Sequence, residues 1–218
     1  MFIELVDALR CPRPHEESWL VLAASRIEAR HIREGTLGCP ICRAAYEIHE
    51  GIADFRDGAS DGAAPLPGQA PSSHAPFELP EADQLAAMMS LGDPLGFAVL
   101  AGDWGRRAEA LLEVVEAPPL LLANPPAEVT MRPGLSGVRS GAALPLALGA
   151  ARAVAVDSAD AAHVEPAARA TRVGGRVIAP AKAHVPDGVR ELARDATVWV
   201  GEREASPSGL VTLHVRRG

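Results

Sequence analysis

Apolar and polar residues alternate over short stretches of the first fifty-five residues, a pattern typical of strands joined by tight turns. The clearest case is residues 46–55, where the alternation runs through Gly51 and predicts a hairpin. Residues 3–10 are predicted as a short helix. Further strands are predicted at residues 19–22 and 26–32, with a turn at 33–35. This region therefore favours a small, β-rich unit.

From residue 80 onward, short runs of consecutive apolar residues alternate with amphipathic segments. Such runs indicate strands buried on both faces, and the segments between them indicate helices. The predicted strands are residues 96–101, 119–123, one near 138, 152–157, 176–179, 197–203 and 210–216, and the predicted helices are 80–91, 106–115, 161–172 and 187–194. The alternation predicts an α/β fold with a Rossmann-like parallel sheet, and the last two strands predict a C-terminal antiparallel hairpin.

Residues 56–79 separate these two regions and are rich in Gly, Ala, Pro and Ser. A segment of this composition has little apolar surface to bury, so we expect a flexible linker. The chain is thus divided into a small unit at residues 1–55, the linker at 56–79 and an α/β domain at 80–218.

Composition narrows the function classes. The chain has 218 residues and a net charge of −7, which argues against broad binding to nucleic acid or anionic membranes. No run approaches the roughly 20 apolar residues that span a bilayer, and the first residues lack the positive charge of a signal peptide. Positive charge is almost entirely arginine, which suggests a high-GC bacterial coding habit. An odd number of cysteines indicates a reducing compartment, so we expect a cytoplasmic protein.

All 3 cysteines lie in the first unit, at Cys11, Cys39 and Cys42. Cys39 and Cys42 form a Cys-Pro-Ile-Cys knuckle that can direct both sulfurs at one ion. Cys11 and His15 can complete a Cys3His tetrahedron, which suits zinc in a closed structural site. The fourth ligand stays open between His15 and His31. The predicted unit is therefore a zinc ribbon, which a metal would stabilise directly.

The first unit resembles the zinc-ribbon family of tRNA-methyltransferase activators and its bacterial relatives. The residues that carry the resemblance are Leu9-Arg-Cys11-Pro, Gly38-Cys39-Pro-Ile-Cys42 and Tyr46-Glu-Ile-His-Glu-Gly51-Ile. Relatives usually have a second cysteine in the first knuckle, where this chain has His15. The resemblance implies a scaffold that binds and stabilises a methyltransferase subunit.

The α/β domain resembles class I S-adenosylmethionine-dependent methyltransferases. The resemblance lies in residues 167–178, with Gly174-Gly175-Arg176, and in Leu144-Pro-Leu ahead of residues 153–157. It implies a cofactor site with a Gly-rich turn after the first strand and a ribose-binding acid after the second. Here the acid before the turn is replaced by Ala101, and the ribose acid by Asn124. We therefore expect a methyltransferase-like domain whose cofactor site has degenerated.

The expected function is a zinc-binding, non-catalytic scaffold, with a methyltransferase or a second copy as protein partner and with no catalytic or cofactor-binding residues. One alternative is an active methyltransferase that uses Asp103, Gly105 and Asn124, with Asp157 as a further candidate. Another alternative is an RNA-binding ribbon with a local basic patch. The patch would consist of Arg13, Arg26, Arg30, Arg33 and Arg43.

Overall fold

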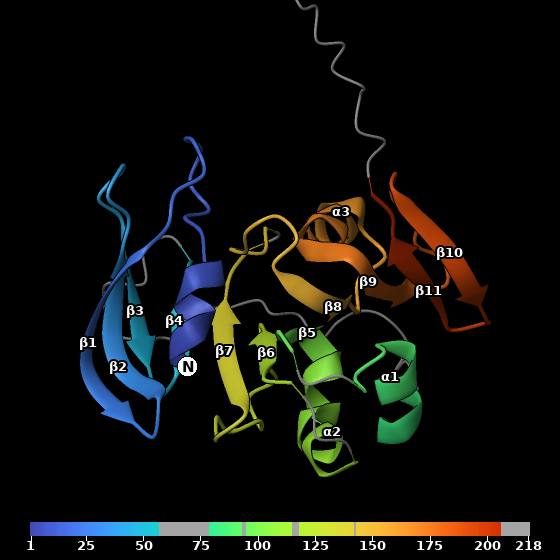
Figure 1. The fold of residues 1–218 in the computed structure, drawn as a ribbon, viewed down its shortest axis with the longest axis horizontal. Helices are drawn as coiled ribbons and strands as arrows, with labels where there is room; N and C mark the ends of the chain where they lie inside the picture. Colours follow the sequence, from blue (N-terminus) through green and yellow to red (C-terminus); the bar gives the residue numbers. More distant parts are fainter. Residues whose placement is uncertain (57–78, 93–94, 115–117, 142, 206–218) are drawn as a thin grey trace, which may run out of the picture.

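The computed structural model describes residues 1–56, 79–92, 95–114, 118–141 and 143–205. Within them the strands form one eleven-stranded sheet, in the order β1-β2-β3-β4-β7-β6-β5-β8-β9-β11-β10. Figure 1 shows this sheet running across the molecule, with the N-terminal strands at one end and β10 at the other. None of the helices in these residues is long and apolar enough to cross a membrane.

The N-terminal unit contains a 3-10 helix and four antiparallel strands. The elements are η1 (Ile3–Ala8), β1 (Val21–Glu28), β2 (His31–Gly38), β3 (Ala45–His49) and β4 (Ile52–Asp54). The hairpin around Gly51 joins β3 to β4, as expected. The turn predicted at residues 33–35 is wrong, because these residues lie inside β2. The chain turns instead at Ala29 and Arg30, whose φ values of 45° and 67° reverse the backbone.

The described residues of the second region supply the remaining strands, three α-helices and one 3-10 helix. The strands are β5 (Ala98–Ala101), β6 (Leu120–Ala123), β7 (Leu135–Arg139), β8 (Ala151–Ala155), β9 (Thr171–Pro180), β10 (Val189–Arg194) and β11 (Val198–Arg203). In the sheet order β7-β6-β5-β8-β9, each neighbouring pair of strands is parallel. Strand β11 pairs antiparallel with both β9 and β10. The order reverses between β5 and β8, the place where doubly wound sheets bind ligands. The predicted α/β class with a C-terminal antiparallel hairpin is confirmed.

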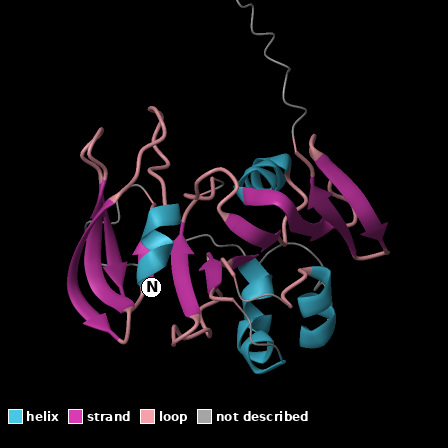
Figure 2. Ribbon diagram, in the orientation of Figure 1, coloured by secondary structure: helices cyan, strands magenta, loops and turns pink. Residues whose placement is uncertain are grey.

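Helices cover the two faces of this sheet. In Figures 1 and 2, α1 (Ala82–Met88) and α2 (Ala108–Val114) lie on one face and α3 (Ala161–Ala170) on the other. Alternate residues of β5 enter different cores: Leu100 packs with Leu85 and Leu111, whereas Val99 packs with Val164 on the opposite face. Strands buried on both faces explain the consecutive apolar runs in the sequence.

The helix predicted at residues 187–194 is wrong, because the segment forms strand β10. It is rich in helix-forming residues, but Gly188 has a φ of +76°, and the strand that follows it pairs with β11 at every residue except Leu192. Tertiary pairing overrides local helix propensity here. The hairpin therefore consists of β10 and β11, and the predicted strand at 210–216 lies outside the described residues.

The N-terminal unit and the larger sheet meet through backbone pairing. Strand β4 pairs in parallel with β7, with Ile52 opposite Gly137. A second contact runs beside it, where Arg10 N donates to the Pro145 carbonyl (2.9 Å) and Ala147 N to the Ala8 carbonyl (2.8 Å). We call these two contacts the junction. The division at residues 55 and 80 stays a prediction, although β4 and β7 belong to one continuous sheet.

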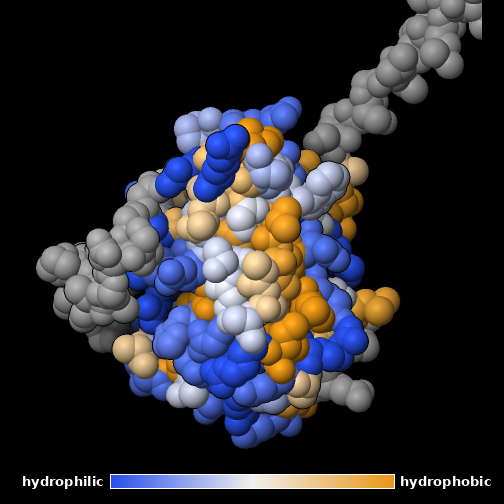
Figure 3. All heavy atoms as spheres, turned by 90° about the vertical axis from the view of Figure 1, so that its left-hand side faces the viewer, coloured by the Kyte–Doolittle hydropathy of each residue, from blue (hydrophilic) through white to orange (hydrophobic). Residues whose placement is uncertain are grey.

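Within the part of the chain that the structure describes, β1 is the last strand of the sheet at its N-terminal end. Figure 3 faces this end and shows a strip of apolar residues bordered by charged ones. Trp19 is 70% exposed, Val21 63% and Ile27 49%, and all three lie on or beside β1. Among the described residues no strand pairs with the outer side of β1, and this edge also carries exposed apolar side chains.

Candidate metal centre

Two backbone turns bring the cysteines together. Cys11 follows the pairing of Arg10 with Trp19, and Cys39 follows the last residue of β2. Behind Cys39 the chain turns tightly: Arg43 N donates to the Cys39 carbonyl (3.0 Å), Cys39 N donates to the Ala44 carbonyl (2.8 Å), and Arg43 has a φ of 60°. This turn directs the Cys39 and Cys42 side chains to the same side, as the knuckle requires.

The structure brings together the four residues predicted as metal ligands. The ligand atoms of Cys11, His15, Cys39 and Cys42, the Cys3His cluster, all lie within 4.8 Å of one another. Sγ of Cys11 is 3.7 Å from Sγ of Cys42, and Sγ of Cys39 is 3.4 Å from Nε2 of His15. A zinc tetrahedron with Zn–S bonds of ~2.3 Å has S···S edges of ~3.8 Å and S···N edges of ~3.6 Å. The spacing and the donor types both fit zinc.

The histidine is oriented for coordination. Nδ1 of His15 lies 2.6 Å from the backbone carbonyl of Glu16, which accepts a hydrogen bond from Nδ1–H and raises the pKa of the imidazole. The other nitrogen, Nε2, then faces the sulfurs with its lone pair. A histidine that binds metal through one nitrogen and donates to a carbonyl through the other is the usual arrangement in zinc sites.

The two buried thiols experience different environments. Burial opposes ionisation of Cys39, but the backbone N–H groups of Cys42 and Ile41 donate to its sulfur and lower its pKa to about 6. Burial raises the pKa of Cys11, against a hydrogen bond from Tyr46 that lowers it. Of these two thiols, Cys39 therefore ionises at the lower pH, and it can initiate binding of a cation.

His31, the rival fourth ligand, lies away from the cluster. Its ring packs on Phe2 with centroids 5.6 Å apart, and its Nε2 accepts a hydrogen bond from Gly134 N (3.3 Å). His31 thus contacts the loop before β7, and His15 is the histidine beside the cysteines.

A second candidate site lies after β5, where the methyltransferase resemblance places the cofactor. The chain enters the 3-10 helix η2 (Gly102–Arg107) here, and Asp103 N donates to Oδ2 of Asp157 (2.9 Å). A Cβ built on Gly102 would lie 1.9 Å from the same oxygen. The carboxylate of Asp157 thus lies against the glycine turn.

The other residues named for this site have partners within the fold. Oδ1 of Asn124 accepts a hydrogen bond from Ser140 N (2.9 Å), so the amide holds the loop after β7. Trp104 is fully buried, and a Cβ on Gly105 would lie 2.9 Å from Cδ of Pro126. The structure places Asp103, Asn124 and Asp157 near the same strand ends, each in a contact made by the chain itself.

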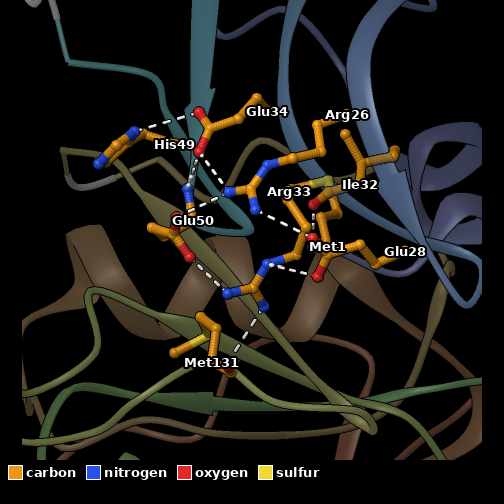
Figure 4. Close-up of polar contacts among 9 residues, drawn as sticks. All are labelled: Met1, Arg26, Glu28, Ile32, Arg33, Glu34, His49, Glu50 and Met131. Carbon is orange, nitrogen blue, oxygen red and sulfur yellow. Dashed lines mark hydrogen bonds and ion pairs between the residues drawn. The ribbon is translucent and has the colours of Figure 1, made fainter.

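The arginines of the alternative RNA-binding surface are largely paired with acids. Figure 4 shows Arg26 contacting Glu34 and Glu50, while Arg33 contacts Glu50 and, at 3.8 Å, Glu28. Arg30 pairs with Glu4. Arg33 also donates to the carbonyl of Met131 (3.4 Å), which links β2 to the loop before β7. These side chains stabilise the N-terminal unit, and their charge is offset locally.

Two residues near these sites did not follow from sequence reasoning alone. Tyr46 was part of the recognised motif, but its contact with Cys11 depends on the pairing of β3 with β2. The sequence makes Asp157 a candidate ligand-binding acid, but its contact with Asp103 depends on the adjacency of β5 and β8. In both cases the partner is more than thirty residues away in the chain.

No protein-family model matches the chain, and no curated protein matches it. Among solved structures, the antibiotic-resistance methyltransferase Kmr is 16% identical, with a TM-score of 0.40, covering 59% of this chain and 95% of Kmr. A protein from Corynebacterium glutamicum is 14% identical, with a TM-score of 0.42, covering 61% of this chain and 86% of that one. Similarity at this level assigns neither an activity nor a cofactor to the chain.

Proposed function

We propose that the protein is a zinc-binding, non-catalytic scaffold in which a zinc ribbon is docked on a degenerate methyltransferase-like domain. The observation that carries the non-catalytic part is the hydrogen bond from Asp103 N to the carboxylate of Asp157. A methyl-donor cofactor would need the turn after β5, because the backbone N–H groups of that turn approach the amino acid part of the cofactor. Here a side chain of the protein already occupies it.

The proposed role of zinc is structural. The N-terminal unit is small, and the Cys3His cluster lies between its two knuckles, so a metal would connect segments separated by more than twenty residues. Three thiolates and one imidazole leave no open coordination position for a substrate. The three cysteines are free thiols, which suits the cytoplasmic location that we expect.

Metal analysis tests the zinc assignment. We expect purified protein to contain one zinc per chain, and His15→Ala to lose most of it. His31→Ala serves as the matched control and should retain full occupancy, because His31 contacts Gly134 instead of the cluster. Absence of metal from the wild-type protein, or its loss in the His31 variant alone, would contradict the assignment.

Calorimetric titration with S-adenosylmethionine tests the non-catalytic assignment. We expect no binding by the zinc-loaded wild-type protein at millimolar cofactor. Asp157→Ala removes the carboxylate from the turn, and we expect it to gain little affinity, since Asn124 still lacks the charge of a ribose-binding acid. Micromolar binding by the wild-type protein would overturn the proposal and favour the active-methyltransferase alternative.

The partner of the scaffold is proposed to be a protein, either a methyltransferase subunit or a second copy of this chain. The exposed apolar residues on and beside β1 support a protein partner, since Arg26, Arg30 and Arg33 of this unit are paired with acids. Size-exclusion chromatography with light scattering separates the two options: a second copy predicts a dimer of the purified protein.

A further inference from the structure

Tyr46 lies directly behind the Cys3His cluster. Its hydroxyl oxygen is 3.1 Å from Sγ of Cys11, and the side chain is 4% exposed. The ring is fixed from two sides: its backbone pairs with Leu37 of β2, and the ring packs on Phe55 with centroids 4.6 Å apart. The hydroxyl therefore has little freedom to turn away from the sulfur.

The direction of this hydrogen bond follows from the chemistry of a loaded site. Sulfur binds zinc as a thiolate and then carries no proton, so the phenol must be the donor. Three thiolates with one divalent cation leave a net charge of −1 in a partly buried site. N–H and O–H donors to sulfur reduce that charge, and Cys39 already receives two from the backbone of Cys42 and Ile41.

We propose that Tyr46 is a positioning residue of the zinc site, whose hydroxyl donates to Cys11 and sets the strength of the bond between its sulfur and the metal. This inference rests on the proposed zinc-binding function. The hydrogen bond holds the Cys11 side chain in the orientation that coordination requires. It also withdraws electron density from the sulfur, so it reduces the net negative charge of the three thiolates around the metal. Outer partners of this kind typically change metal affinity by about 10–100-fold.

Tyr46→Phe removes the hydroxyl and keeps the ring that packs on Phe55. We expect the zinc dissociation constant, measured by competition with a chromophoric chelator, to rise about tenfold or more. In the cobalt-substituted protein, the thiolate-to-metal charge-transfer band should move to lower energy, because the sulfur becomes a stronger electron donor. Altered packing alone would not move this band in a defined direction.

Ser136→Ala is the matched control. Its hydroxyl is also buried, at 1% exposure, and accepts a hydrogen bond from Phe2 N (2.8 Å), but it touches no cysteine. We expect this variant to lose stability while keeping the zinc affinity and the cobalt spectrum of the wild-type protein. An equal loss of affinity in both variants would mean that Tyr46 acts only through folding.

A second measurement does not depend on the phenylalanine variant folding. Tyr46 is the sole tyrosine of the chain, so growth on a fluorinated tyrosine replaces this residue alone. The fluorinated phenol is a stronger donor, and the cobalt charge-transfer band should then move to higher energy. An unchanged band in the fluorinated protein, or unchanged affinity and spectrum in Tyr46→Phe, would overturn the inference and leave zinc binding intact. Wild-type protein that binds no zinc or cobalt would instead refute the proposed function.

Discussion

Gly137 shows how tightly single residues determine the junction. It lies on β7 opposite Ile52 of β4, and a Cβ built on it would be 2.8 Å from Cγ1 of Ile52. That distance is well inside van der Waals contact, so an added methyl group would have to displace the isoleucine or separate the strands. The absence of a side chain at Gly137 is therefore what lets a β-branched residue occupy the neighbouring strand.

We expect Gly137→Ala to lower the free energy of unfolding by about 1–3 kcal/mol, the usual cost of overpacking. Gly141→Ala is the control, because a Cβ there meets no atom within 4 Å. It should be neutral or slightly stabilising, through the reduced entropy of the unfolded chain. Urea denaturation of the zinc-loaded proteins measures both.

The loss of unfolding free energy caused by Gly137→Ala should also depend on Ile52. In an Ile52→Ala background Cγ1, the atom at 2.8 Å, and Cγ2 are absent, so adding Gly137→Ala should cost less stability than it does in the wild-type protein. Additive effects of the two substitutions would show that the contact does not determine the pairing of β4 with β7.

At the scale of elements, a carboxylate closes the turn of the β10–β11 hairpin and supports the pairing of its strands. Oδ1 of Asp195 accepts hydrogen bonds from the hydroxyl and the N–H of Thr197 (2.7 and 2.6 Å) and from Val198 N (2.8 Å). The Thr197 hydroxyl and these two backbone groups hold the pKa of Asp195 below its usual range. A carboxylate that closes the turn in this way favours strand pairing over the helix that the residue types of 187–194 suggest.

We expect Asp195→Asn to destabilise the hairpin at pH 7, because an amide keeps one acceptor and loses the charge. The folded-state pKa is depressed, so the carboxylate contributes stability above its unfolded pKa of about 4 and loses it as the pH falls through the folded value. The difference in unfolding free energy between wild type and variant should therefore shrink on acidification from pH 7. Denaturant titrations at a series of pH values from 7 downward measure this difference in unfolding free energy. Asp187→Asn is the control, because it removes the same charge elsewhere. A difference that stays constant with pH would contradict the role of the Asp195 charge.

At the scale of the whole molecule, the Cys3His cluster lies close to the junction. Cys11 comes directly after the residues that pair with 145–147, and Tyr46 connects the cluster to Phe55, whose N–H donates to the Arg139 carbonyl (2.7 Å). A metal that orders the two knuckles would therefore also order the segment that joins the N-terminal unit to the larger sheet. Stability of the junction is expected to depend on the metal.

We expect removal of zinc by a chelator to lower the midpoint of thermal unfolding by about 10 °C or more, since a few kcal/mol of binding free energy is lost. Hydrogen exchange should rise first in β1 to β4 and in β7, and last in β5 and β8. Cys39→Ser provides the control, because its melting should no longer respond to the chelator. Identical melting of the wild-type protein with and without chelator would show that the metal does not support the fold.

Local sequence determined the parts of this protein that depend on neighbouring residues. The spacing of Cys39 and Cys42 encodes a knuckle, Gly51 encodes a hairpin, and the apolar runs at β5, β6 and β8 encode strands buried on both faces. Each is a property of a few consecutive side chains and their backbone preferences, so it can be read without knowing what lies opposite.

Only the tertiary structure decided the features that depend on distant partners. It placed His15 beside Cys39 and His31 beside Gly134, made residues 189–194 a strand through pairing with β11, and joined the N-terminal unit to the larger sheet through β4 and β7. It also set Asp157 against the turn after β5. The physical reason is that hydrogen bonding and packing across the sheet exceed local preferences of a few tenths of a kcal/mol per residue, and no local pattern records which segments meet.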